Sequence, residues 1–144
     1  MAPPSSLDYA GEVSAAEAWA QLKADPKAQL LDVRTMAEWN FVGLPDLSPL
    51  GRQVHCIEWQ SFPSGARNAG FVIEAGQALA DPKAPVMLLC RSGARSRAAA
   101  IALTEAGFAQ AFNIAGGFEG DADQDGHRGN TNGWKAENLP WRQG

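Results

Sequence analysis

The chain has 144 residues, of which 45% are hydrophobic and 19% are charged, and its net charge at pH 7 is −4. This length suits one domain that buries about two-thirds of the surface its unfolded chain exposes. The acidic balance argues against nucleic acid and membrane surfaces as partners, and two cysteines are too few for a disulfide framework. Neither a signal peptide nor an apolar run of about eighteen residues is visible, so we expect a cytoplasmic protein.

The first predicted element is a helix near the N-terminus. Residues 1–12 begin with two prolines and two serines, and we expect them to form a flexible arm, with structure starting near Val13. Ser14 and Glu17 have the spacing of a capping box, which marks the start of a helix. Pro26 ends the apolar periodicity that follows.

A strand and a second short helix come next. The apolar run within residues 29–34 predicts the strand, and Thr35 with Glu38 forms another capping-box spacing directly after it. Residues 45–52 are rich in proline and leucine without periodicity and predict a loop, and residues 54–59 predict a short strand.

The second half of the chain repeats this alternation of strand and helix. A helix is predicted over 68–79, a strand over 86–89, an alanine-rich helix that ends before Gly107, and a last strand over 111–114. Alternating strands and helices predict an α/β fold with a mostly parallel sheet covered on both faces. The carboxyl ends of parallel strands share one edge of the sheet, which is the usual ligand site.

Cys90 lies at that edge, between the strand over 86–89 and the alanine-rich helix. The first turn of a helix carries unpaired N–H groups and a partial positive charge, so an anion is stabilised there. Such surroundings and nearby arginines lower the pKa of a cysteine from about 8.5 to roughly 3.5–7.5, and the thiolate is the nucleophile. We therefore expect Cys90 to be a nucleophilic thiolate, the alternative being a buried structural cysteine.

A basic, glycine-containing turn follows this cysteine. Gly93 allows successive N–H groups to curl around an anion. A helical period of 3.6 residues prevents Arg91, Arg95 and Arg97 from all facing one point. We expect Arg91 and Arg95 to lie near the anion, and Arg97 to be either a solvated residue or the partner of an acidic side chain.

Several segments, in this order and spacing over about residues 13–141, resemble a single rhodanese domain. They are Leu31-Asp32-Val33-Arg34 with Glu38-Trp39, then Leu89 to Ser96, then Asn113-Ile114-Ala115-Gly116-Gly117, and finally Gly133-Trp134 with Leu139-Pro140-Trp141. The resemblance implies a rhodanese-like three-layer α/β fold, with a mostly parallel central sheet flanked by helices, as a single domain over residues 13–144.

The resemblance also implies a rhodanese-type sulfurtransferase. Its catalytic residue would be Cys90, which takes a sulfane sulfur from a small anionic donor such as thiosulfate, becomes a persulfide, and passes the sulfur to a nucleophilic acceptor such as a protein thiol. The implied substrate-binding residues are Arg91, Ser92, Gly93, Ala94, Arg95 and Ser96. Neither a metal nor an organic cofactor is expected.

Three further residues match the acidic and basic residues of the family near its second strand, namely Asp32, Arg34 and Glu38. We expect them to cap, pair and orient the scaffold beneath the turn rather than to do chemistry.

Two other functions compete with this one. Rhodanese-like domains also serve as binding, regulatory or sulfur-carrier modules, although regulatory ones commonly lack the cysteine. Cysteine-dependent phosphatases and arsenate-type reductases use a C-x5-R loop, but the sixth position after Cys90 is Ser96, and the arginines stand at 95 and 97. The short loop also favours sulfur over the larger phosphate.

The second thiol, Cys56, follows His55 in the strand predicted over 54–59. Two adjacent ligands do not satisfy zinc, which prefers four. We expect a buried core cysteine, and the alternative is a resolving thiol that releases the persulfide. His55 and His127 are far from Cys90 in the sequence and are not needed as bases if the thiol is already ionised.

A polar insertion at about 119–133 imitates the start of a calcium-binding loop. Asp121, Asp123 and Asp125 stand at alternate positions before Gly126, as in an EF-hand. The twelfth position is Asn132 rather than a bidentate glutamate. We therefore expect a solvated polar loop at the rim of the site rather than a calcium site.

Overall fold

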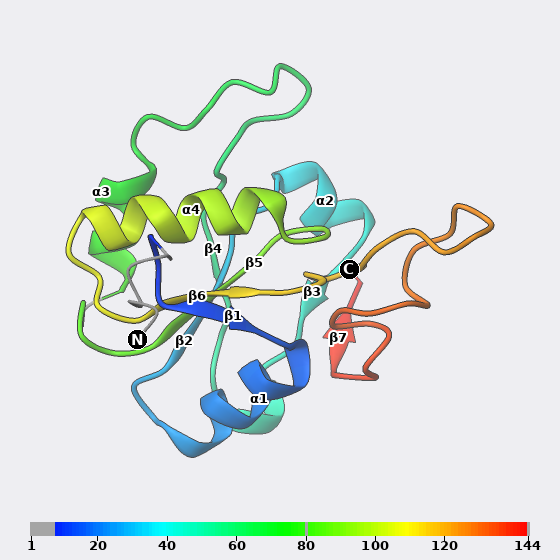
Figure 1. Ribbon diagram of the computed structural model, residues 1–144, viewed down its shortest axis with the longest axis horizontal. Helices are drawn as coiled ribbons and strands as arrows, with labels where there is room; N and C mark the ends of the chain where they lie inside the picture. The colour runs from blue at the N-terminus through cyan, green and yellow to red at the C-terminus, as the bar shows by residue number, and fades with distance from the viewer. Residues whose placement is uncertain (1–7, 80, 144) are drawn as a thin grey trace.

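The computed structural model describes residues 8–79 and 81–143, which form a central sheet with helices on both faces (Figure 1). The strands follow the order β1-β6-β5-β2-β4, and each neighbouring pair in this sheet is parallel. Their bounds are β1 Gly11–Val13, β2 Gln29–Asp32, β4 His55–Cys56, β5 Val86–Leu89 and β6 Ala111–Ile114. The predicted α/β fold with a mostly parallel central sheet is confirmed.

The sheet divides the core into two layers, and helices cover both of its faces (Figure 1). One layer lies under α1 (Ala15–Ala24), and the other lies under α3 (Phe71–Ala78) and α4 (Ala94–Glu105). The short helix α2 (Met36–Phe41) follows β2 at the carboxyl edge of the sheet. In the part of the chain that the structure describes, none of the helices has the length and apolar character that a membrane crossing requires.

Strand β5 lies in the middle of the sheet, and all four of its residues are buried. Met87 and Leu89 belong to the α1 layer, whereas Leu88 and Cys90 belong to the α3–α4 layer. This alternation is expected of a strand, and burial on both faces explains why its sequence is an unbroken apolar run.

Several predicted boundaries are confirmed. The strands predicted over 86–89 and 111–114 are β5 and β6, and both predicted capping boxes form at the N-termini of α1 and α2. The other two strands are shorter than predicted. The run over 29–34 ends at Asp32, whose carboxylate accepts the backbone N–H of Arg34, and the run over 54–59 pairs with β2 only at His55 and Cys56.

The start of the fold differs from the expected arm over residues 1–12. Gly11 and Glu12 belong to β1, which pairs with β6 at the edge of the sheet, so ordered structure begins earlier than predicted. Such a short glycine-containing strand carries no periodic signal. Residues 1–7 of the expected arm lie outside the described residues. The helix predicted from residue 68 begins at Phe71, because the Asn68 side chain accepts the N–H of Gly70 and forms a turn.

The C-terminal segment closes the α1 side of the domain. Strand β7 (Trp141–Arg142) pairs antiparallel with β3 (Leu44–Pro45), and both were missed because two-residue strands have no pattern to read. The turn η2 (Ser48–Leu50) follows β3. Trp134 is fully buried, and its indole N–H donates to the carbonyl of Pro140 at 2.7 Å.

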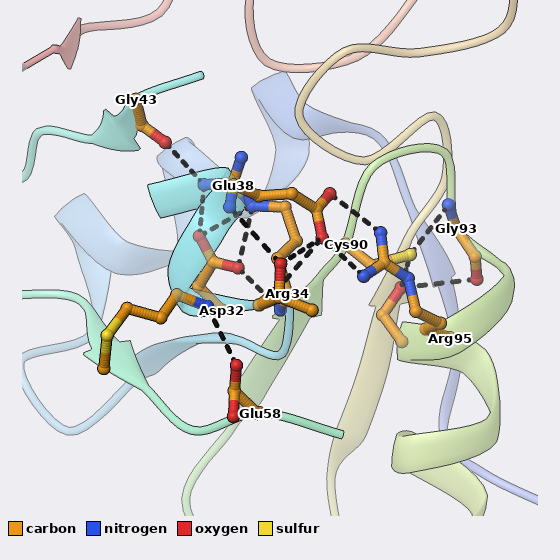
Figure 2. Close-up of polar contacts among 11 residues, drawn as sticks. Asp32, Arg34, Glu38, Gly43, Glu58, Cys90, Gly93 and Arg95 are labelled. Carbon is orange, nitrogen blue, oxygen red and sulfur yellow. Dashed lines mark hydrogen bonds and ion pairs between the residues drawn. The ribbon is translucent and has the colours of Figure 1, made fainter. Parts of the chain in front are cut away.

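Asp32 and Arg34 form an ion pair whose two side chains are completely buried at the end of β2 (Figure 2). The Arg34 Nη2 lies 2.6 Å from Asp32 Oδ2 and 2.7 Å from the carbonyl oxygen of Gly43. The guanidinium also lies over the ring of Phe118, 4.3 Å from its centroid. This pair therefore joins β2 to the turn before β3 and to the segment after β6.

Glu38 and Arg95 join α2 to the first turn of α4 (Figure 2). The two guanidinium nitrogens of Arg95 lie 2.6 and 2.9 Å from the two Glu38 oxygens, which is bidentate geometry. Burial opposes ionisation of Glu38, but the hydrogen bonds and charge of Arg95, together with Thr35, hold the pKa of Glu38 below its ordinary value.

We expect Arg34→Met to lower the free energy of unfolding by about 3–5 kcal/mol, because it leaves the Asp32 carboxylate buried without its partner. Urea denaturation followed by tryptophan fluorescence measures this. Lys27→Met, at an exposed position, is the matched control and should cost no more than roughly 0.5 kcal/mol. Equal losses in the two variants would contradict the stabilising role of the pair.

We expect Glu38→Gln to lower the free energy of unfolding by about 1–2 kcal/mol at pH 7, because a charge-assisted pair is lost. The folded-state pKa of Glu38 is depressed, so its contribution is complete above the unfolded value of about 4.3 and disappears as the pH falls through the folded value. The difference in the free energy of unfolding between wild type and Glu38→Gln should therefore disappear at acidic pH. Glu105→Gln, exposed at the end of α4, is the matched control and should cost no more than roughly 0.5 kcal/mol at pH 7. A Glu38→Gln difference that persists unchanged at pH 3 would refute the assignment.

Candidate functional site

Cys90 occupies the junction that the sequence predicted, between the carboxyl end of β5 and the N-terminus of α4. The residue is only 1% exposed. We call residues 90–96 the cysteine turn. Within it Gly93 and Ser96 are buried, Ser92 and Arg95 are half-buried, and Arg91 and Ala94 are exposed.

Two groups of this turn contact the sulfur. The backbone N–H of Gly93 donates to Cys90 Sγ at 3.1 Å (Figure 2). Ser96 Oγ lies 3.3 Å from the same atom. Gly93 is the N-cap of α4 with φ of +120°, a conformation that favours glycine. The sulfur therefore sits at the positive end of a twelve-residue helix, where a negative charge is stabilised.

The segment after β6 holds the other side of the turn. The N–H of Phe118 donates to the Cys90 carbonyl at 2.8 Å, and the N–H of Glu119 donates to the Arg91 carbonyl at 3.0 Å. A Cβ on Gly117 would lie 2.3 Å from the Cys90 oxygen, so only glycine permits this approach. This contact was not predicted from the sequence, where Gly116 and Gly117 were quoted as part of the resemblance to a rhodanese domain, although paired glycines after a strand are a signal of close backbone approach.

The two arginines expected near the anion have different surroundings. Arg95 points to Glu38 and is held by it, so part of its charge is already neutralised. Arg91 is exposed beside the turn. Arg97 pairs with Glu12 instead, with Nε 3.3 Å from a carboxylate oxygen, which is the acidic partner considered for it.

A buried polar chain leads from the sulfur to the surface. Ser96 Oγ donates to Asn113 Oδ1, and Asn113 Nδ2 donates to the two Glu12 oxygens at 2.9 and 3.1 Å. Glu12 also accepts from Arg97 and Tyr9. Neither Asn113 nor Glu12 was assigned a role from sequence, because a single polar residue in a strand does not reveal its partners.

A cleft of about 660 Å³ opens beside the cysteine turn. Arg91, Arg95 and Glu119 are among its lining residues. Its other walls come from α2 and the loop after β4, where Phe41 is 79% exposed and Phe62 is 70% exposed. The cleft is large enough for more than a small inorganic anion.

Cys56 is exposed on the edge strand β4, so the prediction of a buried core cysteine is wrong. Cys56 is paired with Asp32 of β2, and Asp32 is paired with Leu89 of β5. Residues paired in register point to the same face of a sheet, and Leu89 faces the α1 layer, whereas Cys90 faces the α3–α4 layer. The two thiols thus lie on opposite faces of the sheet. Desolvation by the protein around the thiol and the charge of Asp32 raise the pKa of Cys56 to about 12. Both facts disfavour a resolving role.

His55 contacts the amino end of β2, whereas Cys90 follows β5 at the carboxyl edge of the sheet. The His55 Nε2 lies 3.1 Å from the Gln29 side-chain oxygen, and burial and the Arg52 charge lower the pKa of His55.

The aspartate-rich loop projects from the domain after β6 (Figure 1). Asp123 Oδ1 accepts the N–H groups of Asp125 and His127, each at 2.9 Å, and Asp121 N–H donates to the Asn132 side chain at 2.8 Å. The loop thus uses its acidic side chains to hold its own backbone. Across residues 8–79 and 81–143, His, Cys, Asp and Glu side chains form no group of three that could hold a metal ion.

Comparison with proteins of known structure finds two informative likenesses. The crystal structure of Rv0390 from M. tuberculosis is 49% identical, with a TM-score of 0.87, over 94% of this chain and 99% of that one. The solution structure of the polysulfide-sulfur transferase homodimer of Wolinella succinogenes is 25% identical, with a TM-score of 0.63, over 95% of this chain and 80% of that one.

Sequence comparison points the same way. The chain is 29% identical over 132 residues to rhodanese-like domain-containing protein 4 of Arabidopsis thaliana, a chloroplastic protein of which it spans 25%. These likenesses support a sulfurtransferase-like domain with a rhodanese-like fold. The family model described as STR4 middle domain matches residues 10–144, and the chain therefore belongs to that rhodanese-related family.

Proposed function

We propose that this protein is a rhodanese-type sulfurtransferase that carries a sulfane sulfur on Cys90. The observation that carries the proposal is the position of Cys90 Sγ, which receives the Gly93 N–H at the N-terminus of α4. This environment stabilises a negative charge on sulfur, whether as thiolate or as persulfide. The likeness to a polysulfide-sulfur transferase supports sulfur as the group transferred.

The proposed reaction has two displacements. The Cys90 thiolate attacks the outer sulfur of thiosulfate, a new S–S bond forms, and the donor S–S bond breaks as sulfite leaves with the electron pair. An acceptor thiolate or other nucleophile then attacks the outer sulfur of the persulfide, and Cys90 leaves as thiolate. The cycle needs no external oxidant or reductant.

Charges near the turn would recruit the anionic donor. Arg91 is exposed and lines the cleft, where its charge reaches an incoming thiosulfate. Arg95 is tied to Glu38, so it supports the turn more than it attracts the donor. The apolar walls with Phe41 and Phe62 offer contact area to a larger acceptor.

The phosphatase alternative needs an arginine that grips a phosphoryl group. Arg95 and Arg97 flank the required position, but each is engaged by a carboxylate, Glu38 and Glu12 respectively. These pairs favour sulfur transfer over phosphoryl transfer.

The direct test is intact mass after incubation with thiosulfate, using the two single-thiol variants Cys56→Ser and Cys90→Ser. We expect one added sulfur atom on wild type and on Cys56→Ser, lost on treatment with cyanide, and none on Cys90→Ser. The same result is expected for any donor that delivers sulfane sulfur.

A sulfur adduct on Cys90→Ser, or no adduct on Cys56→Ser with any sulfane donor, would contradict the proposal. Hydrolysis of an aryl phosphate that depends on Cys90 would favour the phosphatase. Partner binding that survives Cys90→Ser, without sulfur loading of wild type, would favour a regulatory module.

We expect Arg91→Gln to lower kcat/KM for thiosulfate by roughly 3–10-fold, mainly through KM, and the loss to shrink at high salt because an exposed charge is screened. Steady-state rates with cyanide as acceptor measure this at two ionic strengths. Lys27→Gln, an exposed cation outside the cleft lining, is the matched control. A salt-independent loss would show that Arg91 acts through the structure of the turn instead.

A further inference from the structure

Asn113 is a fully buried amide in β6, placed between the serine that touches Cys90 and a carboxylate near the surface. Its Oδ1 accepts from Ser96 Oγ, and its Nδ2 lies 2.9 and 3.1 Å from the two Glu12 oxygens. Ser96 Oγ in turn lies 3.3 Å from Cys90 Sγ. The proposed reaction assigns no role to Asn113 or Glu12.

The donors and acceptors in this chain leave one arrangement. A carboxylate only accepts, so the NH₂ of Asn113 must face Glu12 and its carbonyl oxygen must face Ser96. That oxygen also only accepts, as does the Gly93 carbonyl oxygen 3.3 Å from Ser96 Oγ, and the shorter contact with Asn113 directs the single hydroxyl proton of Ser96 to Asn113. Ser96 then presents lone pairs to Cys90, which suits a thiol that donates its proton and not an anionic sulfur.

An anionic sulfur changes the balance of acceptors around Ser96. Hydrogen bonds to a charged acceptor are roughly twice as strong as those between neutral groups. The hydroxyl needs only to rotate about its C–O bond, because the sulfur at 3.3 Å is already within reach. The proton stays on Ser96 throughout, while the hydrogen bond moves from one acceptor to the other.

We propose that Asn113 is a positioning residue that competes with the Cys90 sulfur for the one proton of Ser96. The hydroxyl binds Asn113 while Cys90 is a thiol and turns to the sulfur when it is charged. The Gly93 N–H donates in both states. For the thiolate, the inference does not depend on the proposed function. Its extension to the persulfide, which carries the same negative charge, rests on the proposed function.

Glu12 keeps the Asn113 amide in this orientation. Burial raises the pKa of Glu12, but hydrogen bonds from Arg97, Tyr9 and Asn113 outweigh this and hold it below the ordinary value, so the carboxylate is charged at neutral pH. Without that acceptor the amide is free to reverse, and its NH₂ then faces the serine.

Other charged groups lie around the site. Arg95 in the cysteine turn interacts electrostatically with Cys90, and Glu38 and Asp32 act on Arg95 in turn. Arg91 belongs to the same turn, and Arg97 and Tyr9 lie beside Glu12. The variants below leave these groups unchanged except where one is named as the control.

The test is the rate of Cys90 alkylation by iodoacetamide as a function of pH, followed by intact mass in a Cys56→Ser background. Ser96→Ala should move the midpoint of the profile up by roughly one pH unit, because a donor to the anion is lost. Asn113→Ala should move it down by roughly half a pH unit, because the nearer competing acceptor is gone and only the Gly93 carbonyl oxygen at 3.3 Å remains to compete with the sulfur. The double variant should match Ser96→Ala alone.

A second pair of variants keeps the test usable if Asn113→Ala does not fold. Glu12→Gln, at a side chain that is 34% exposed, allows the amide to reverse and should also move the midpoint down. Arg97→Gln removes the same ion pair but leaves the Glu12 carboxylate, so it should move the midpoint by no more than roughly 0.2 pH unit.

The proposal is overturned if Asn113→Ala or Glu12→Gln moves the midpoint in the same direction as Ser96→Ala. An Asn113→Ala shift that persists without the Ser96 hydroxyl also overturns it, because the effect then does not pass through the serine. Alkylation needs no sulfur donor, so failure of persulfide formation in the mass experiment is distinguishable from failure here.

Discussion

The hydrogen bond from the Gly93 N–H to the Cys90 sulfur is the interaction on which the site depends. It exists because only four residues separate the end of β5 from the start of α4, so the free amide of Gly93, the N-cap of α4, reaches the side chain of the residue that follows the strand. A buried sulfur has little water to stabilise a charge, and backbone dipoles take that place. The chemistry we propose for Cys90 follows from this junction.

The rest of the domain holds the junction from three sides. The segment after β6 binds the carbonyls of Cys90 and Arg91, α2 binds Arg95 through Glu38, and Asn113 in β6 binds Ser96 from below. Each contact comes from a different element, so the site is built from residues far apart in the sequence. The resemblance to a rhodanese domain therefore depends on several segments in order and not on any single motif.

The sequence was sufficient for features set by local rules. The unbroken apolar run of β5, the two capping boxes and the glycine after Cys90 each act within a few residues, so the strand, the helices and the turn were predicted. Features that depend on contacts between distant segments of the chain were not predicted. The exposure of Cys56 depends on β4 being an edge strand, and the roles of Asn113 and Gly117 depend on which segment each one touches. Arg95 was expected near the anion, and its ion pair with Glu38 of α2 was not predicted for the same reason.

The most direct test of the account is a crystal structure of the protein after treatment with thiosulfate. The account predicts a second sulfur atom bonded to Cys90 Sγ at about 2.05 Å, enclosed by the amides of the cysteine turn, with the Ser96 hydroxyl within hydrogen-bond distance of sulfur. An unmodified Cys90, with the added sulfur on Cys56 or absent under conditions where the donor is consumed, would contradict it.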